Sequence, residues 1–238
     1  EFIFYLIALY KIGFKYSFII TLEEFDHLTF FKTMKNTLLY VGATQIYIFV
    51  LTACLSLLPE GVFAVFRYVQ TLSNKIYSNL IGPFMTIFFT KYSLLVQQSK
   101  SVLNIVKKTT SGVINMNIII IIGSLLLGNY IIDLIWGSSK FDASDVRLAY
   151  MFLIFNCMAI LINSIGNLYR KIVVAEGYAS KLYISWVYTQ FLCSALTYII
   201  VSNFKINGLY FILPLNAFLM FLASFFNYKK LCNNISYD

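Results

Sequence analysis

The sequence predicts an all-α protein, a polytopic membrane bundle of six transmembrane helices. Hydrophobic residues make up 60% of the chain and charged residues only 12%, with a mean hydropathy of +0.78. Soluble domains hold roughly 25% charged residues, so this composition is typical of a membrane protein. Several apolar runs reach the roughly 20 residues that a helix needs to cross a bilayer, and runs this long are helices rather than barrel strands.

Polar residues divide the apolar sequence into six expected spans joined by short connections. The spans cover approximately residues 36–58, 62–92, 113–136, 146–174, 178–202 and 207–228. An earlier apolar run at residues 2–10 is too short to cross a bilayer and looks like the end of a preceding transmembrane helix. We therefore interpret the chain as a fragment. Residues 1–35 are the end of that helix plus a cytoplasmic linker, residues 36–228 a six-helix unit, and residues 229–238 a cytoplasmic tail.

The segment between the second and third spans has two interpretations. In "KYSLLVQQSKSVLNIVKKTTSG", residues 91–112, four apolar residues lie among basic and polar ones. These residues are Val102, Leu103, Ile105 and Val106. The segment is either a short amphipathic helix on the inner membrane surface, where each nearby lysine gains about 1 kcal/mol from anionic lipid, or a solvated connector.

The distribution of basic residues predicts the orientation in the membrane. The chain has 18 Lys and Arg residues against 10 Asp and Glu. If the segment before residue 36 is cytoplasmic, thirteen basic residues fall on cytoplasmic loops and three on the opposite side, as the positive-inside rule requires. The thirteen are Lys11, Lys15, Lys32, Lys35, Lys91, Lys100, Lys107, Lys108, Arg170, Lys171, Lys181, Lys229 and Lys230. We expect a multi-pass protein of the cytoplasmic membrane with a cytoplasmic C-terminus. Because no dense basic block occurs, we expect no nucleic-acid partner.

No motif of a catalytic or metal centre is present. The sequence lacks a glycine-rich phosphate loop, H-E-x-x-H and G-x-S-x-G. The four cysteines show no metal-ligand spacing, and we interpret them as small hydrophobic residues rather than as a disulfide framework. The sequence therefore predicts neither an enzyme nor a cofactor.

The second span carries a polar and cationic stripe. A helix places residues at i, i+4, i+7, i+8 and i+11 on one face, and Gln70 lies beside that face. The stripe residues are Arg67, Thr71, Asn74, Lys75 and Ser78. A lysine at the centre of a membrane helix costs about 2.5–3.5 kcal/mol, so it is a candidate for function. Either the stripe lines a cavity and binds an anion, or Arg67 snorkels outward and Lys75 pairs with a carboxylate beyond this chain.

A second stripe of amides follows the fourth span. Asn156, Asn163 and Asn167 recur at i, i+7 and i+11. Membrane amides usually hydrogen-bond to neighbouring helices, each bond contributing about 0.6 kcal/mol, which favours a role in packing. Asn163 and Asn167 nevertheless remain candidates for contact with a substrate.

Three segments together resemble one family. "LPEGVFAVFRYVQTLSNKIYSNLIGPFMTIFFTKYSLL", residues 58–95, resembles the eighth helix of the flippase superfamily that includes lipid II flippases, O-antigen and polysaccharide flippases and multidrug exporters. The matching positions are Gly61, Tyr68, Leu72 and Lys91-Tyr92-Ser93. "KFDASDV", residues 140–146, is similar to an outer loop of lipid II flippases. "VVAEGYASK", residues 173–181, is similar to an inner turn of polysaccharide flippases.

The resemblance implies the C-terminal lobe of a twelve-helix, two-lobe transporter that works by alternating access. Its implied partners are a lipid-linked sugar diphosphate, membrane lipids and the N-terminal lobe of the same transporter. Gln70 and Thr71 replace an Asp-Arg pair common in lipid II flippases, and Thr90 replaces a proline. These departures weaken the assignment to lipid II and leave an O-antigen or capsule-type substrate open.

Two other functions are considered beside the flippase. A cation-coupled exporter of small amphiphiles is expected to keep an acidic residue within a helix, and none lies in the middle of a span. A membrane glycosyltransferase would use acidic residues in an outer loop. Asp142 and Asp145 lie there, but they are more simply helix caps for the fourth span.

Overall fold

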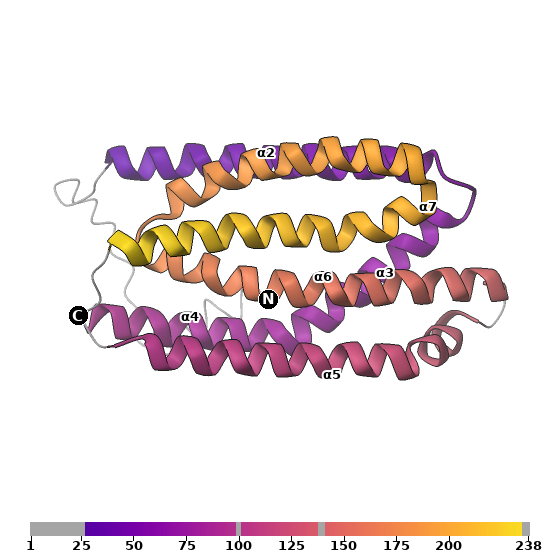
Figure 1. The fold of residues 1–238 in the computed structure, drawn as a ribbon, viewed down its shortest axis with the longest axis horizontal. Helices are drawn as coiled ribbons and strands as arrows, with labels where there is room; N and C mark the ends of the chain where they lie inside the picture. Colours follow the sequence, from indigo (N-terminus) through magenta and orange to yellow (C-terminus); the bar gives the residue numbers. More distant parts are fainter. Residues whose placement is uncertain (1–26, 99–100, 138–140, 235–238) are drawn as a thin grey trace, which may run out of the picture. The chain divides into compact units, whose positions relative to one another are not determined.

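A computed structural model of the chain describes residues 27–98, 101–137 and 141–234 (Figure 1). Every element within these ranges is helical, which confirms the all-α prediction. The elements are α2 (His27–Ser56), α3 (Val62–Ile76), η2 (Tyr77–Ile81), α4 (Gly82–Gln97), α5 (Leu103–Trp136), α6 (Ala143–Ala175) and α7 (Ala179–Asn234). The chain divides into two compact units, residues 1–32 and 33–238, and the arrangement described below is that of the second unit. The apolar run at residues 2–10 lies outside the described residues.

Five helical stretches are long and apolar enough to cross a membrane. They cover Phe30–Ser56, Val62–Gln97, Asn104–Trp136, Ala143–Ala175 and Ala179–Asn233. The first four contain the first four predicted spans, apart from the last two residues of the first span. The two remaining predicted spans both fall within α7, apart from Tyr178, so the described residues contain five such stretches where six were expected.

The helix α7 is bent into two arms at Lys205, where φ is 50° and ψ is −128°. In Figure 1 the second arm runs back along the first, and two hydrogen bonds join the arms. Trp186 Nε1 donates to Ser224 Oγ at 3.2 Å, and Asn227 Nδ2 donates to Ser185 Oγ at 2.8 Å. Gly208 permits the tight turn, because a Cβ there would lie 2.6 Å from the carbonyl oxygen of Ile200.

The polar segment before the third predicted span is not a separate element. Residues 103–112 are the first turns of α5, which continues without a break to Trp136. Val102 is buried, and Ile105 and Val106 pack against the core. A separate short helix and a connector between helices are therefore both wrong for residues 103–112, and tertiary packing covers the apolar side of this segment.

A π-helical turn interrupts the second span. Pro83 has no N–H to donate to the carbonyl of Asn79, and its ring crowds that carbonyl, so the α-helical pattern fails there. Instead the N–H of Gly82 donates to the carbonyl of Tyr77, five residues earlier, in the π pattern of η2. The helix stays continuous from Val62 to Gln97 but changes direction between α3 and α4 (Figure 1).

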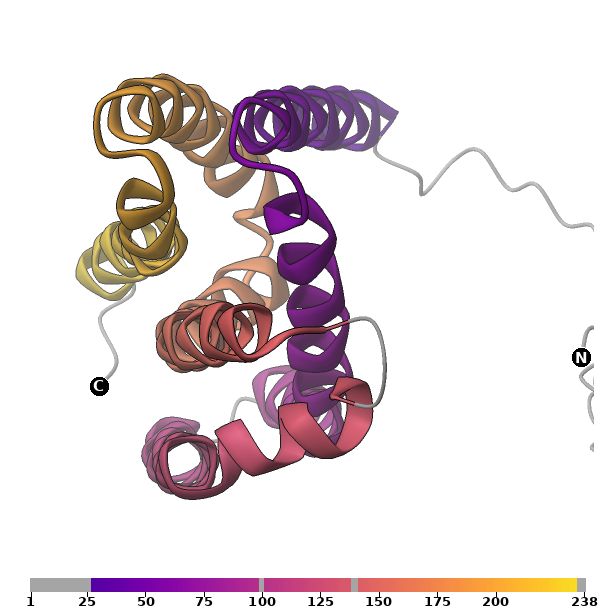
Figure 2. The ribbon, with the colours of Figure 1, turned by 90° about the vertical axis from the view of Figure 1, so that its right-hand side faces the viewer.

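The helix α6 lies at the centre of the second unit. It packs against α3, α4, α5 and α7, and Figure 2 shows these helices around it. Phe152 of α6 is fully buried, with its ring centroid 5.4 Å from Phe66 of α3 and 5.0 Å from Tyr210 of α7. One aromatic side chain thus joins three helices.

The start of α6 has a capping box. The carboxylate of Asp142 accepts hydrogen bonds from the backbone N–H of Ser144 and of Asp145, and the Asp145 side chain accepts one from the backbone N–H of Asp142. The hydrogen bond from the Ser144 hydroxyl and those from the backbone lower the pKa of Asp142. The interpretation of these two residues as helix caps is confirmed.

Candidate functional site

The cationic stripe of α3 and η2 lies on the outside of the second unit. Its residues, Arg67, Thr71, Asn74, Lys75 and Ser78, are all exposed. The opposite face of α3 is buried in the core through Val62, Val65, Phe66, Val69 and Ser73. The amphipathic character of α3 therefore directs its apolar side inward and its cations away from the unit.

Arg67 is held in place by polar neighbours. Its Nη1 donates to Gln70 Oε1 at 3.1 Å, and its Nη2 donates to Thr52 Oγ1 of α2 at 3.2 Å. The guanidinium carbon lies 5.3 Å from the ring centroid of Phe63. Among the residues that the structure describes, neither Arg67 nor Lys75 forms an ion pair with a carboxylate. Both positive charges are thus exposed on the surface of the second unit.

The hydroxyl groups of the stripe bond to their own helix. Thr71 Oγ1 donates to the carbonyl of Arg67 at 2.9 Å, and Ser78 Oγ donates to the carbonyl of Lys75 at 3.2 Å. Their oxygens still have lone pairs to accept a further hydrogen bond. The stripe therefore presents two cations with hydroxyl and amide groups between them.

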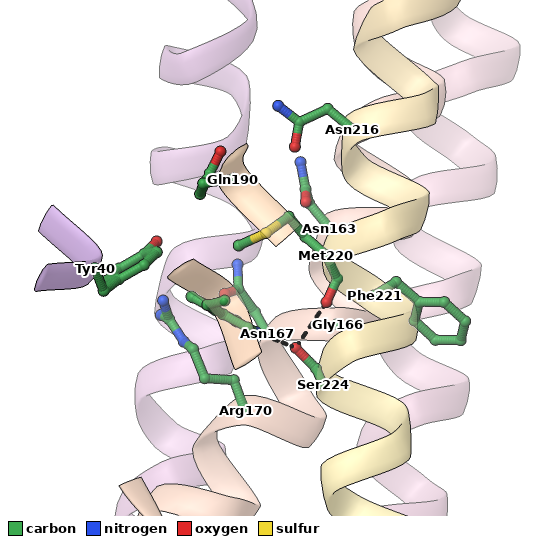
Figure 3. Close-up of a pocket in the computed structure, with 11 residues that line it drawn as sticks. Tyr40, Asn163, Gly166, Asn167, Arg170, Gln190, Asn216, Met220, Phe221 and Ser224 are labelled. Atoms are coloured by element: carbon green, nitrogen blue, oxygen red, sulfur yellow. Dashed lines mark hydrogen bonds between the residues drawn. The ribbon is translucent and has the colours of Figure 1, made fainter. Parts of the chain in front are cut away.

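A second candidate site is a cavity between α6 and the two arms of α7 (Figure 3). Its volume is about 210 Å³. Each of these helices contributes side chains spaced by about one turn, the spacing that places them on one face. The polar lining residues are Tyr40, Asn163, Asn167, Arg170, Trp186, Gln190, Asn216 and Ser224. We call this the Arg170 cavity.

The two predicted groups of site residues lie on different surfaces. Asn163 and Asn167 line the Arg170 cavity, whereas the cationic stripe lies on the exposed face of α3 and η2. Asn167 Nδ2 also donates to the hydroxyl of Tyr77 in η2 at 2.8 Å, so this amide has the packing role that its position favoured. Asn156 is buried, with its Nδ2 bonded to the carbonyl of Phe152.

Sequence reasoning missed most of the cavity. Arg170 lies seven residues after Asn163, on the same helix face, so extending the amide stripe by one step would have found it. The distribution of basic residues predicts a cytoplasmic loop for Arg170 instead. Gln190 and Asn216 come from the two arms of α7, and no local pattern marks them as neighbours of α6.

Gly166 sets the distance between the walls of the cavity. A Cβ on Gly166 would lie 3.2 Å from Cα of Phe221, a backbone atom that cannot rotate away. Small residues at such positions let two helix backbones approach closely. We expect Gly166→Ala to lower the melting temperature in detergent. The added methyl group overpacks the interface and destabilises the fold by about 1–3 kcal/mol. The higher helix propensity of alanine stabilises it by at most about 1 kcal/mol.

The matched control is Gly123→Ala in α5, where a Cβ would meet nothing within 4 Å. It should leave the melting temperature unchanged or raise it. Equal effects of the two substitutions would show that the backbones do not meet at Gly166.

Comparisons with family models, with curated proteins and with solved structures give no match. The resemblance to flippases therefore rests on the three sequence segments quoted above. The function must be argued from the helices, the cationic stripe and the Arg170 cavity themselves.

Proposed function

We propose that the chain is the C-terminal lobe of a membrane flippase. The flippase moves a polyprenyl-diphosphate-linked oligosaccharide, either an O-antigen or polysaccharide unit or lipid II, across the cytoplasmic membrane by alternating access. The observation that carries the proposal is the exposed cationic stripe on a helix long and apolar enough to span a bilayer.

The depth of Lys75 favours a polar path rather than lipid around the stripe. Lys75 lies 13 residues after Val62, about 20 Å along the helix axis. A lysine facing lipid at this depth would cost about 2.5–3.5 kcal/mol. A water-filled path between this lobe and an N-terminal lobe of the same transporter removes that cost, because the exposed face of α3 then meets water and substrate.

The chemistry of the stripe suits a diphosphate. A guanidinium binds phosphate oxygens through two parallel hydrogen bonds, and an ammonium on a flexible stem keeps contact while the headgroup moves. Asn74 and the hydroxyls of Thr71 and Ser78 suit the hydroxyl groups of a sugar. This transport needs no covalent step, so the proposal requires no catalytic group.

We further propose that each arm of α7 crosses the membrane, which makes six spans in this lobe. Each arm exceeds the roughly 20 residues that a span needs. Lys205 then lies at the outer surface, and the C-terminus lies in the cytoplasm, as the positive-inside rule predicts.

The test is expression of the full-length protein in cells that lack their own flippase. We expect lipid-linked sugar to reach the outer face of the membrane, where an externally added enzyme can label it. If no sugar appears although the protein is present in the membrane, the flippase proposal is wrong. Ion-dependent efflux of a cationic amphiphile from the same cells would then favour a cation-coupled exporter.

A further inference from the structure

We infer that the Arg170 cavity is a binding site for a small oxyanion that also carries a hydroxyl group, such as hydrogen phosphate or the phosphomonoester headgroup of phosphatidic acid. The site is separate from the cationic stripe and lies on other helices. The inference does not depend on what the protein transports.

The charge of the cavity favours an anion. Arg170 is half-buried, and its guanidinium carbon lies 5.2 Å from the ring centroid of Trp186, a contact that holds the planar group in place. No carboxylate is among the described residues that line the cavity. The nearest acidic residue along α6, Glu176, instead accepts a hydrogen bond of 2.7 Å from Tyr92 of α4. A guanidinium without a carboxylate partner binds oxyanions well, because its donors match their geometry.

Gln190 shows that the lining is not complete without a ligand. Its side chain is 5% exposed, and its Oε1 has no hydrogen-bond partner within the described residues. A buried polar atom left without a partner costs about 1–3 kcal/mol. A hydroxyl group of the ligand can donate to this oxygen, while the opposite amide orientation would offer N–H donors to an anionic oxygen.

Neutral amides complete the site around Arg170. In Figure 3 the side chains of Asn163 and Asn216 lie at one end of the cavity, and Arg170 lies with Tyr40 and Asn167 at the other. The arrangement combines one charge with several groups that both donate and accept hydrogen bonds. Such a lining suits an ion that has both negative oxygens and a hydroxyl group.

The volume limits the ligand to one phosphate-sized group. The cavity of about 210 Å³ is smaller than the roughly 300–1,000 Å³ of sites for drug-sized molecules. A phosphate group with a few waters, each occupying about 30 Å³, fits this space. Arg170 lies five residues before the end of α6 at Ala175, about 7 Å along the axis. With α6 crossing the membrane as proposed above, its end lies near the surface, where a lipid phosphate and a free phosphate both have access.

The experiment measures phosphate binding to the purified full chain in phosphatidylcholine nanodiscs, by the rise in melting temperature at constant ionic strength. We expect Arg170→Gln to weaken binding of inorganic phosphate at least about tenfold, since it removes a charge-assisted contact. The matched control is Lys171→Gln. Its Nζ lies 4.9 Å from the ring centroid of Phe89 on α4, outside the cavity, and it should change the affinity less than about twofold.

Gln190→Met tests the site without changing its charge. It should also weaken phosphate binding, yet it should stabilise the ligand-free protein, because it removes the unpartnered oxygen. In a second series, nanodiscs that contain phosphatidic acid replace the added phosphate. Stabilisation by this lipid alone, lost in Arg170→Gln, identifies the headgroup as the ligand. If neither phosphate nor the lipid binds, or if both charge variants lose binding equally, the inference is wrong.

Discussion

Replacing Arg67 and Lys75 together by alanine is expected to reduce export of lipid-linked sugar about 100-fold. Each charge-assisted hydrogen bond contributes about 1.5–3 kcal/mol, and 1.4 kcal/mol corresponds to a factor of ten, so the loss of two such bonds accounts for this reduction. Insertion into the membrane should not suffer, because removing two cations from an exposed helix face makes α3 more apolar. The measurement is outer-face labelling of the sugar, normalised to the amount of protein in the membrane.

The control is Lys229→Ala with Lys230→Ala, which removes two exposed cations from the last turns of α7. It removes the same total charge without touching the stripe and should leave export near the wild-type rate. Normal export by the variant lacking Arg67 and Lys75 would mean that both cations have a structural role only.

Replacing Phe152 by alanine is expected to lower the free energy of unfolding by about 3–6 kcal/mol. Lipid or detergent is as apolar as the helix interface, so burial itself contributes little. The cavity that remains costs about 24 cal/mol per Å³, or about 2–3 kcal/mol for the roughly 100 Å³ removed. The lost ring contacts with Phe66 and Tyr210 add about 0.5–1.5 kcal/mol each.

Unfolding in mixed micelles, followed by circular dichroism, measures this loss. Phe49 on α2 is 73% exposed and provides the control, because Phe49→Ala removes the same side chain without opening an internal cavity. If both variants lost the same stability, α6 would not be the packing centre of the second unit.

Some features of this fold follow directly from local sequence. Apolar length predicts helices, because a chain in lipid must satisfy its backbone hydrogen bonds internally. Spacing along a helix places Arg67 and Lys75 on one face. Pro83 disturbs the helical hydrogen bonds whatever packs around the helix, because it lacks an N–H group. The acidic residues before α6 predict its cap because capping involves only neighbours in the chain.

Other features depend on contacts between distant parts of the chain. Residues 103–112 could not be distinguished from a surface segment, because only the core around Val102 shows what covers them. Lys205 has non-helical φ and ψ angles, so two helical arms meet there, but the polar residues at this point do not predict how the arms pack against each other. The boundary there depends on how closely Gly208 approaches Ile200.

The sequence by itself therefore determined the helical class, the apolar length of the helices and the polar stripe of α3. Each of these features depends on residues that lie close together in the chain. Only the tertiary structure decided that the stripe faces away from the core and that Arg170 and Gln190 share a cavity. The physical reason is that a side chain's environment depends on which helices pack around it. In α6 and α7 that packing joins residues far apart in the chain, such as Asn163 and Asn216.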